Sequence, residues 1–184
     1  GSMEFSMVPR NNPNDDPSKP YDRPRKGEIS RLTAAKRAIV KALGGVEDGS
    51  VFNMIFYASD VWTWNDETVV MEPDTRSEAM RFCESLEAVG ATNIYGALKV
   101  ALEQAGATGG DEWSEPKIDT IFFLSDGKPT TGQFTERNEI LREIKRANDL
   151  RRIVIHTIAL GQFDKEFMRL LAQENGGVFV DLGE

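Results

Sequence analysis

The sequence predicts a three-layer α/β/α domain built around a mostly parallel sheet. Strand-like and helix-like segments alternate along the chain, which is the order that parallel β-α-β units need. The three longest strand-like segments, 51–57, 118–124 and 153–160, are apolar almost without interruption. Strands of that kind are covered on both faces, as they are in parallel sheets. The chain of 184 residues is long enough for one such domain.

Charge, hydropathy and cysteine content exclude several classes of protein. The 30 acidic and 22 basic side chains give a net charge of −8, which argues against binding to the phosphate backbone of a nucleic acid. No apolar run approaches the roughly 20 residues that a membrane-spanning helix needs. Cys83 is the single cysteine, so an internal disulfide and a multi-cysteine zinc site are both excluded.

The first 28 residues are predicted to lie outside the folded domain, which we expect to span residues 29–184. Gly1, Ser2 and Met3 resemble the scar of a cleaved purification tag. The following stretch is rich in Pro, Asn and Asp and has no pattern that would bury an apolar face. We therefore interpret residues 1–28 as a tag remnant followed by a flexible segment.

The first half of the domain is predicted to contain two helices around two strand segments. Apolar residues at helical spacing predict a helix over 31–43, with Ser30 as its N-cap and Gly44-Gly45 as its end. The aromatic and β-branched run 51–57 predicts a buried strand. Segment 61–71 has the composition of a short hairpin that turns at Asn65-Asp66, and Thr75 with Glu78 forms a capping-box pattern that begins a second helix.

The second half repeats the alternation of helix and strand. A helix is predicted from Asn93, and the next two are predicted to begin after the capping residues Thr135 and Asp164. The apolar segments 118–124 and 153–160 predict the two central strands, and Val178–Val180 predicts a short final one.

Two predicted loops carry oxygen donors to the place where a parallel sheet binds ligands, the carboxyl ends of its strands. Asp126 and Gly127 follow the buried strand 118–124, and Thr92 with Asn93 stands at a helix start. Carboxylate and hydroxyl oxygens are donors that suit Mg²⁺, Mn²⁺ or Ca²⁺. Either loop taken alone is more often a plain turn or a helix cap.

The chain resembles the von Willebrand factor type A domains. The resemblance rests on GATNIYGAL (90–98), IFFLSDGKPTTG (121–132) and IHTIALGQFDKEFMRLLAQENGGVFV (155–180). It implies a Rossmann-like fold and a divalent cation, Mg²⁺ or else Mn²⁺ or Ca²⁺, bound at a metal-ion-dependent adhesion site. Thr92 matches the family's threonine ligand and Asp126 its later aspartate. Ser125 stands beside them at a position where the family often has threonine.

The family's Asp-x-Ser-x-Ser motif and the strand before it have no full counterpart here. Phe5-Ser6-Met7 is similar to the end of that motif, so Ser6 aligns with its last serine, while Ser2 falls at the position of its aspartate. Three explanations stay open: the strand was left out by a domain-boundary decision, another chain supplies it, or the natural site is remodelled and holds no metal. We expect weak or no metal affinity, because the initiating aspartate is absent.

The resemblance implies a non-enzymatic, adhesion-type interaction module in which the cation binds a carboxylate of a partner protein. It weakly favours an extracellular or cell-envelope location. A second hypothesis is a scaffold that completes its sheet with another chain, including a strand-exchanged homo-oligomer. A third is a metal-dependent hydrolase that uses Asp126 as ligand or nucleophile.

The remaining reactive or aromatic residues are given structural interpretations. His156 lies inside a predicted strand and is expected to be a hydrogen-bonded sheet histidine, because the chain has no second histidine. A triad of Ser125, His156 and Asp126 is disfavoured by the alternation of side chains along a strand. Cys83 is expected in the core, and the three tryptophans are expected either to bind a partner or to cover a sheet edge: Trp62, Trp64 and Trp113.

Overall fold

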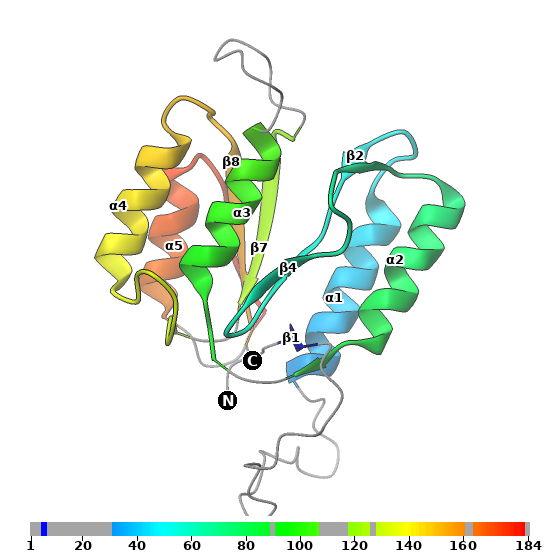
Figure 1. Cartoon of the computed structure of the whole chain (residues 1–184), viewed down its shortest axis with the longest axis horizontal. Helices are drawn as coiled ribbons and strands as arrows, with labels where there is room; N and C mark the ends of the chain where they lie inside the picture. Colours follow the sequence, from blue (N-terminus) through cyan, green and yellow to red (C-terminus); the bar gives the residue numbers. More distant parts are fainter. Residues whose placement is uncertain are drawn as a thin grey trace, which may run out of the picture.

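The computed structural model describes residues 5–6, 31–88, 91–106, 118–125, 128–160 and 164–182. Two groups of elements stand side by side in Figure 1, one containing α3, α4, α5, β7 and β8, the other α1, α2, β2 and β4. The buried apolar side chains form two clusters, one centred on each group. Leu124 and Leu160 of the parallel sheet pack into the cluster of α1 and α2, and Tyr57 of the hairpin belongs to that of α3, α4 and α5. None of the described helices is both long and apolar enough to cross a membrane.

The first group is a parallel sheet with helices on one face. Strands β7 (Thr120–Ser125), β8 (Val154–Ala159) and β9 (Phe179–Asp181) pair in that order. Side chains from one face of β7 and β8 pack into a single core with three helices: α3 (Ile94–Gly106), α4 (Arg137–Asn148) and α5 (Lys165–Glu174). This arrangement matches the predicted alternation of buried parallel strands and helices.

The second group is an antiparallel hairpin packed on two helices. Strands β2 (Val51–Phe52) and β3 (Ile55–Tyr57) pair with β5 (Val69–Val70) and β4 (Val61–Thr63), respectively. Helices α1 (Arg31–Gly45) and α2 (Pro73–Ser85) pack against each other beside it. The predicted hairpin turn at Asn65-Asp66 is wrong. The chain reverses instead at 58–60, where the Ala58 N–H donates to the Asp60 carbonyl over 2.8 Å.

Strand β3 belongs to both cores. Phe56 is buried in the cluster around α1 and α2, whereas the next residue, Tyr57, is buried in the cluster around α3, α4 and α5. The Tyr57 ring stacks on Phe123 of β7 with 5.8 Å between ring centroids. Its hydroxyl donates to the Leu124 carbonyl over 2.9 Å. Tyr57 therefore joins the hairpin to the parallel sheet through its side chain, without strand pairing.

The two sheets remain separate in the described part of the chain. There, β7 pairs with β8 alone and β3 pairs with β4 alone. The segment Phe5–Ser6 forms a two-residue strand, β1, that is antiparallel to β6 (Glu87–Ala88). Among the described residues, no strand joins β3 to β7, which is where the sheet divides in Figure 1.

Two predicted helix starts are wrong. Helix α2 begins two residues before Thr75, with Pro73 at its first position and Glu72 as its N-cap residue. Proline lacks the N–H that a first helical turn leaves unpaired, so it begins the helix in place of the capping box. The N-cap residue of α4 is Glu136, not Thr135. The prediction for α5 is confirmed, because the Asp164 carboxylate accepts from the Phe167 N–H over 3.1 Å.

Substitution of Gly177 by alanine is expected to destabilise the fold. A Cβ at this position would overlap the main-chain carbonyl of Ile155 in β8, and a backbone atom cannot move aside without distorting the sheet. We expect Gly177→Ala to lower the free energy of unfolding in urea by about 2 kcal/mol or more. Gly45→Ala is the matched control, because a Cβ there meets nothing within 4 Å. Equal stability of the two variants would contradict this account.

Candidate functional site

Three loops meet at the carboxyl end of the parallel sheet. Residues 58–60 follow β3, residues 91–93 precede α3, and residues 128–132 come after β7. The Asn93 N–H donates to the Ala58 carbonyl over 2.9 Å, which joins the first two loops. The Thr130 N–H donates to the Thr92 carbonyl over 3.0 Å, which joins the second and third. The loop 91–93 is therefore the middle of the three.

Thr92 is held tightly by its main chain. Only 1% of the residue is exposed. Its N–H donates to the Thr130 side-chain hydroxyl over 2.8 Å. Its carbonyl accepts from the N–H groups of Thr130 and Thr131, over 3.0 and 3.4 Å. This reciprocal bonding fixes the main chain of Thr92 against the segment that follows β7.

The predicted metal ligands are described to different degrees. Thr92 lies at the expected edge of the sheet. Asp126 lies outside the described residues, as do Ser2 and Gly90, and for Ser6 only the main-chain pairing with Glu87 is described. Ser125 is described and is 2% exposed, and its carbonyl accepts from the Leu160 N–H over 3.1 Å. The structure thus brings Thr92 to the segment that follows Asp126 in the chain.

The oxygen donors at this edge are of the kind that a hard cation binds. Hydroxyl groups of threonine and serine come from all three loops, and such groups serve as neutral ligands beside carboxylates in Mg²⁺ and Ca²⁺ sites. Within the described ranges no three His, Cys, Asp or Glu side chains gather closely enough to hold a metal ion. Of the predicted ligands Thr92, Asp126 and Ser6, Asp126 is the one that carries a negative charge, and it lies outside the described residues.

Sequence reasoning missed two residues of this edge. Thr130 accepts the Thr92 N–H through its hydroxyl. Ser59 accepts the Ala91 N–H through its hydroxyl over 3.3 Å and the Asn93 side-chain N–H through its carbonyl, also over 3.3 Å. The signal for both was a hydroxyl residue in the loop that follows an apolar strand, Ser59 after β3 and Thr130 after β7.

His156 is a sheet histidine, as predicted. It faces Phe122 across the β7–β8 ladder, and the two rings stack with 5.1 Å between centroids. Its Nδ1 accepts from the Val178 N–H over 3.0 Å. Ser125 pairs with Ala159, three positions along β8, so the Ser125 and His156 side chains lie on opposite faces of the sheet. That geometry excludes the Ser125–His156 pair of a hydrolytic triad.

Two tryptophans contribute to packing. Trp62 and Trp64 are half-buried and pack against the core cluster of the hairpin. Trp62 stacks on Phe56, and Trp64 lies 5.6 Å from Phe52 between ring centroids. Both rings therefore belong to the packing of this core. Trp113 lies outside the described residues.

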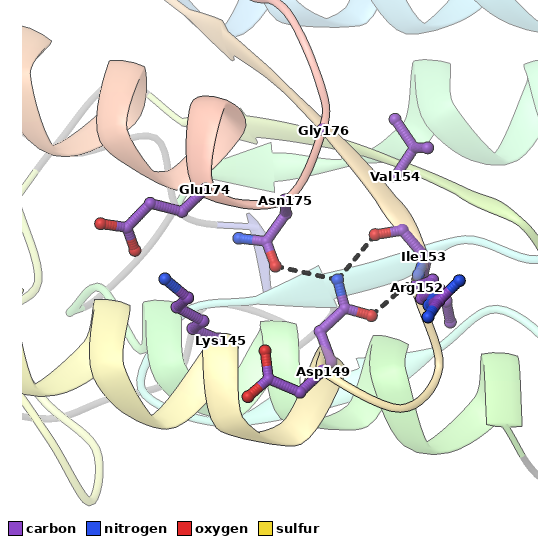
Figure 2. A pocket seen from close by; sticks show the side chains of 9 residues that line it. Lys145, Asp149, Arg152, Ile153, Val154, Glu174, Asn175 and Gly176 are labelled. Carbon is purple, nitrogen blue, oxygen red and sulfur yellow. Dashed lines mark hydrogen bonds between the residues drawn. The ribbon is translucent and has the colours of Figure 1, made fainter.

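A cavity of about 260 Å³ lies at the opposite end of the sheet, where β8 begins (Figure 2). Asn148 bridges its wall: its side chain donates to the carbonyl of Ile153 over 2.7 Å and to Oδ1 of Asn175 over 2.8 Å, and accepts from the Ile153 N–H over 2.9 Å. These bonds join the ends of α4 and α5 to the start of β8. The two asparagines are therefore structural.

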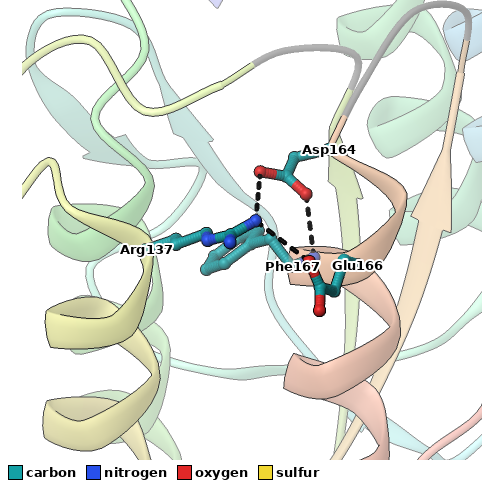
Figure 3. Close-up of polar contacts among 4 residues, drawn as sticks. All are labelled: Arg137, Asp164, Glu166 and Phe167. Carbon is teal, nitrogen blue, oxygen red and sulfur yellow. Dashed lines mark hydrogen bonds and ion pairs between the residues drawn. The ribbon is translucent and has the colours of Figure 1, made fainter.

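An ion-pair network braces the helix starts at the carboxyl end. Arg137, at the first position of α4, lies 3.5 Å from the Asp164 carboxylate and 3.1 Å from that of Glu166 (Figure 3). Asp164 also caps α5 through the Phe167 N–H. The network holds the starts of α4 and α5 together, next to the loops that follow β7 and β8.

The sequence comparisons identify the class of the chain. It matches the sequence profile of the von Willebrand factor type A domain over residues 22–181. The chain therefore belongs to this family of protein-interaction modules. The predicted family is confirmed by a match that covers most of the sequence.

Individual relatives are distant and much longer. Inter-alpha-trypsin inhibitor heavy chain H1 of Mesocricetus auratus is 29% identical over 154 residues, which are 82% of this chain and 16% of that protein. Von Willebrand factor A domain-containing protein 3A of Homo sapiens is 30% identical over 129 residues, which are 68% of this chain and 10% of that protein. The chain thus spans less than a fifth of the length of these curated relatives.

A solved structure supports the fold. The structure described as von Willebrand factor type A from Catenulispora acidiphila matches with a TM-score of 0.67 at 18% sequence identity. The match covers 83% of this chain and 34% of that one. The likeness confirms the predicted α/β fold of the type A domain.

Cys83 is inert in the folded protein. The residue is fully buried, and burial raises the pKa of its thiol from 9.0 to about 11. Its Sγ lies 3.6 Å from the Met54 sulfur. The thiol therefore stays protonated at neutral and mildly basic pH, which removes Cys83 from the candidate nucleophiles.

We expect iodoacetamide at pH 8.5 to label native Cys83 at least about 100-fold more slowly than the urea-unfolded chain, because the native thiol forms less thiolate and is shielded. The folded pKa lies above the unfolded one. The free energy of unfolding is therefore expected to fall as the pH rises through 9 and to level off near 11. Labelling is followed by mass spectrometry. Rapid labelling of the native protein would contradict this expectation and show that the core around Cys83 opens.

Proposed function

We propose that this domain binds a carboxylate of a partner protein through a divalent cation held by Thr92, Asp126 and Ser6. The observation that supports the proposal is the bonding of the Thr92 main chain to Thr130 and Thr131. This bonding holds the threonine loop against residues that follow Asp126 in the chain. The carboxyl ends of parallel strands are also the general ligand-binding edge of such sheets.

The proposed ligands divide into one charged and two neutral groups. Asp126 supplies the negative charge, while Thr92 and Ser6 contribute hydroxyl oxygens. Because two of the ligands are neutral, a bound Mg²⁺, Mn²⁺ or Ca²⁺ keeps part of its positive charge and attracts an external carboxylate. The protein's part is to hold the oxygens at fixed positions on the ends of rigid strands and helices.

We assign the domain a binding role and no catalytic one. The described geometry separates Ser125 from His156, and Cys83 is buried and protonated. A metal-dependent hydrolase would need a general base beside Asp126. An extracellular or cell-envelope location fits a module of this kind.

The proposal predicts a weak but specific cation site. We expect Mn²⁺ to broaden the NMR signals of the Thr92 and Thr130 amides, with an apparent Kd of about 10⁻³ M. Asp126→Ala removes the charged ligand and is expected to weaken Mn²⁺ binding at least about tenfold. Thr92→Val removes a neutral ligand and is expected to weaken Mn²⁺ binding less.

Asp119→Ala is the matched control, because this exposed aspartate precedes the same strand at its other end. Broadening that is unchanged in Asp126→Ala would contradict the cation site. Micromolar binding that Asp126→Ala abolishes would instead show that the site is complete despite the missing aspartate of the motif. Capture of an Asp-containing peptide that EDTA reverses would extend the result to the partner's carboxylate.

A second candidate function is assembly through an added strand, and the divided sheet favours it. The carbonyls of Asp119, just before β7, and of Ser125, at its end, both point to the β8 side and accept from the N–H groups of Val154 and Leu160. Main-chain groups alternate in direction along a strand, so those of Phe122 and Leu124 point to the other edge. There the Leu124 carbonyl accepts from the Tyr57 hydroxyl. A strand from another chain would find its main-chain partners on this edge.

The face of the sheet beside this edge is apolar. Its carboxyl end packs on the cluster of α1 and α2 through Leu124 and Leu160, whereas the described elements leave its other part exposed. Phe122 is 69% exposed and Val178 is 60% exposed, and both lie on the same sheet face as His156. An added strand with apolar side chains would bury part of this surface. Unpaired edges of this kind are sites of strand addition and strand exchange.

Light scattering tests the assembly. We expect the dimer fraction to rise with protein concentration, and Tyr57→Phe to strengthen dimerisation about fivefold, because it frees the Leu124 carbonyl for a strand from the second copy. Tyr95→Phe is the control, since it removes a hydroxyl from α3, where Tyr95 contacts Phe134 edge-on, and leaves the Leu124 carbonyl bonded to Tyr57. A monomer at every concentration for both wild type and Tyr57→Phe would exclude self-exchange.

A further inference from the structure

The Asn93 side chain lies where the three loops of the candidate site meet. Its Oδ1 accepts from the Gly96 N–H over 2.9 Å, which caps the first turn of α3. Its Nδ2 donates to the Ser59 carbonyl over 3.3 Å, beyond the end of β3. One amide group therefore bonds to a helix start with one atom and to a strand end with the other.

The third loop packs directly on the same amide. Gly132 has a φ of +104°, and a Cβ at this position would overlap Asn93 Oδ1. Gly96 closes the other side, where a Cβ would lie 2.7 Å from the same oxygen. The two glycines leave room for the amide, and any side chain at position 132 would displace it.

Asn93 is also covalently next to the proposed ligand. The Asn93 N–H donates to the Ala58 carbonyl over 2.9 Å, and the preceding residue, Thr92, is bonded to Thr130 on both its N–H and its carbonyl. The peptide between Thr92 and Asn93 is thus fixed from both sides. We infer that the orientation of this peptide depends on the contacts of the Asn93 side-chain amide with Ser59 and Gly132.

We propose that Asn93 is the positioning residue of this site, which joins the ends of β3 and β7 to α3 so that Thr92 is in place before any cation arrives. The part that concerns the cation rests on the proposed function, whereas the loop clamp does not. A ligand that is already in place loses less conformational entropy when the cation binds. Gly132 acts with Asn93, because only glycine fits against the amide at a positive φ.

A serine at position 93 separates this role from that of a plain helix cap. Asn93→Ser keeps an uncharged acceptor that caps helices about as well as asparagine, but it removes the Nδ2 donor and the packing on Gly132. Hydrogen exchange of the Thr92 and Thr130 amides, followed by NMR without metal, reports on the clamp. We expect exchange at both amides to accelerate at least tenfold in Asn93→Ser, while the Gly96 amide changes less than twofold.

Glycine variants give a second, independent measurement. Gly132→Ala is expected to accelerate exchange at Thr92 and Thr130 to the same extent, because its Cβ displaces the amide. Gly49→Ala is the matched control, since Gly49 also has a positive φ, +89°, but a Cβ there meets nothing within 4 Å. Wild-type exchange at Thr92 and Thr130 in both Asn93→Ser and Gly132→Ala would overturn the proposal.

Mn²⁺ titration separates this proposal from the proposed function. If the cation site exists, Asn93→Ser should weaken Mn²⁺ binding five- to tenfold, and unchanged affinity would refute a role of Asn93 in positioning Thr92 for the cation. If the wild type binds no Mn²⁺, the cation proposal fails, and the exchange measurements alone then decide whether Asn93 clamps the loops.

Discussion

The alternation of side chains along β3 is the constraint on which the two halves of the molecule depend. Phe56 points into one core and Tyr57 into the other, and both are nearly fully buried. Because successive residues of a strand point to opposite faces, this short strand contributes to both cores at once. The end of β3 is thereby fixed relative to α3, and the loop 58–60 reaches Asn93. The candidate site thus depends on the packing of two aromatic residues.

The parallel half of the fold and both helices of the other half were predictable from the sequence, whereas the turn of the hairpin was not. Strands β7 and β8 carry long apolar segments with clear ends, and Asp164 has the local chemistry of a helix cap. The hairpin was misread because Asn65-Asp66 is a good turn sequence. Asn53 accepts from the Met54 and Asn65 N–H groups through its side-chain oxygen, at the interruption between β2 and β3, so that Asn65 bonds to a side chain and does not form the hairpin turn. Whether a side chain takes the main-chain hydrogen bonds of a strand in this way depends on its tertiary neighbours.

The sequence predicted where the candidate site lies but not all of the residues that form it. Parallel strands bring their carboxyl ends to one edge, so Thr92 and the segment after Ser125 had to lie near each other. The contributions of Ser59 and Thr130 depend on which loop folds over which, and a sequence pattern does not contain that information. The role of Gly132 became visible only with the position of the Asn93 amide. The ligand roles of Asp126 and Ser6 remain predictions.

The edge of β7 that no described strand pairs with makes the solubility of the protein depend on its net charge. A sheet edge beside a bare phenylalanine is a template on which further chains can stack. The net charge of −8 keeps such chains apart in neutral buffer through mutual repulsion. That protection vanishes near the isoelectric point of 4.8. Mild acid or concentrated salt is therefore expected to favour association of chains through this edge.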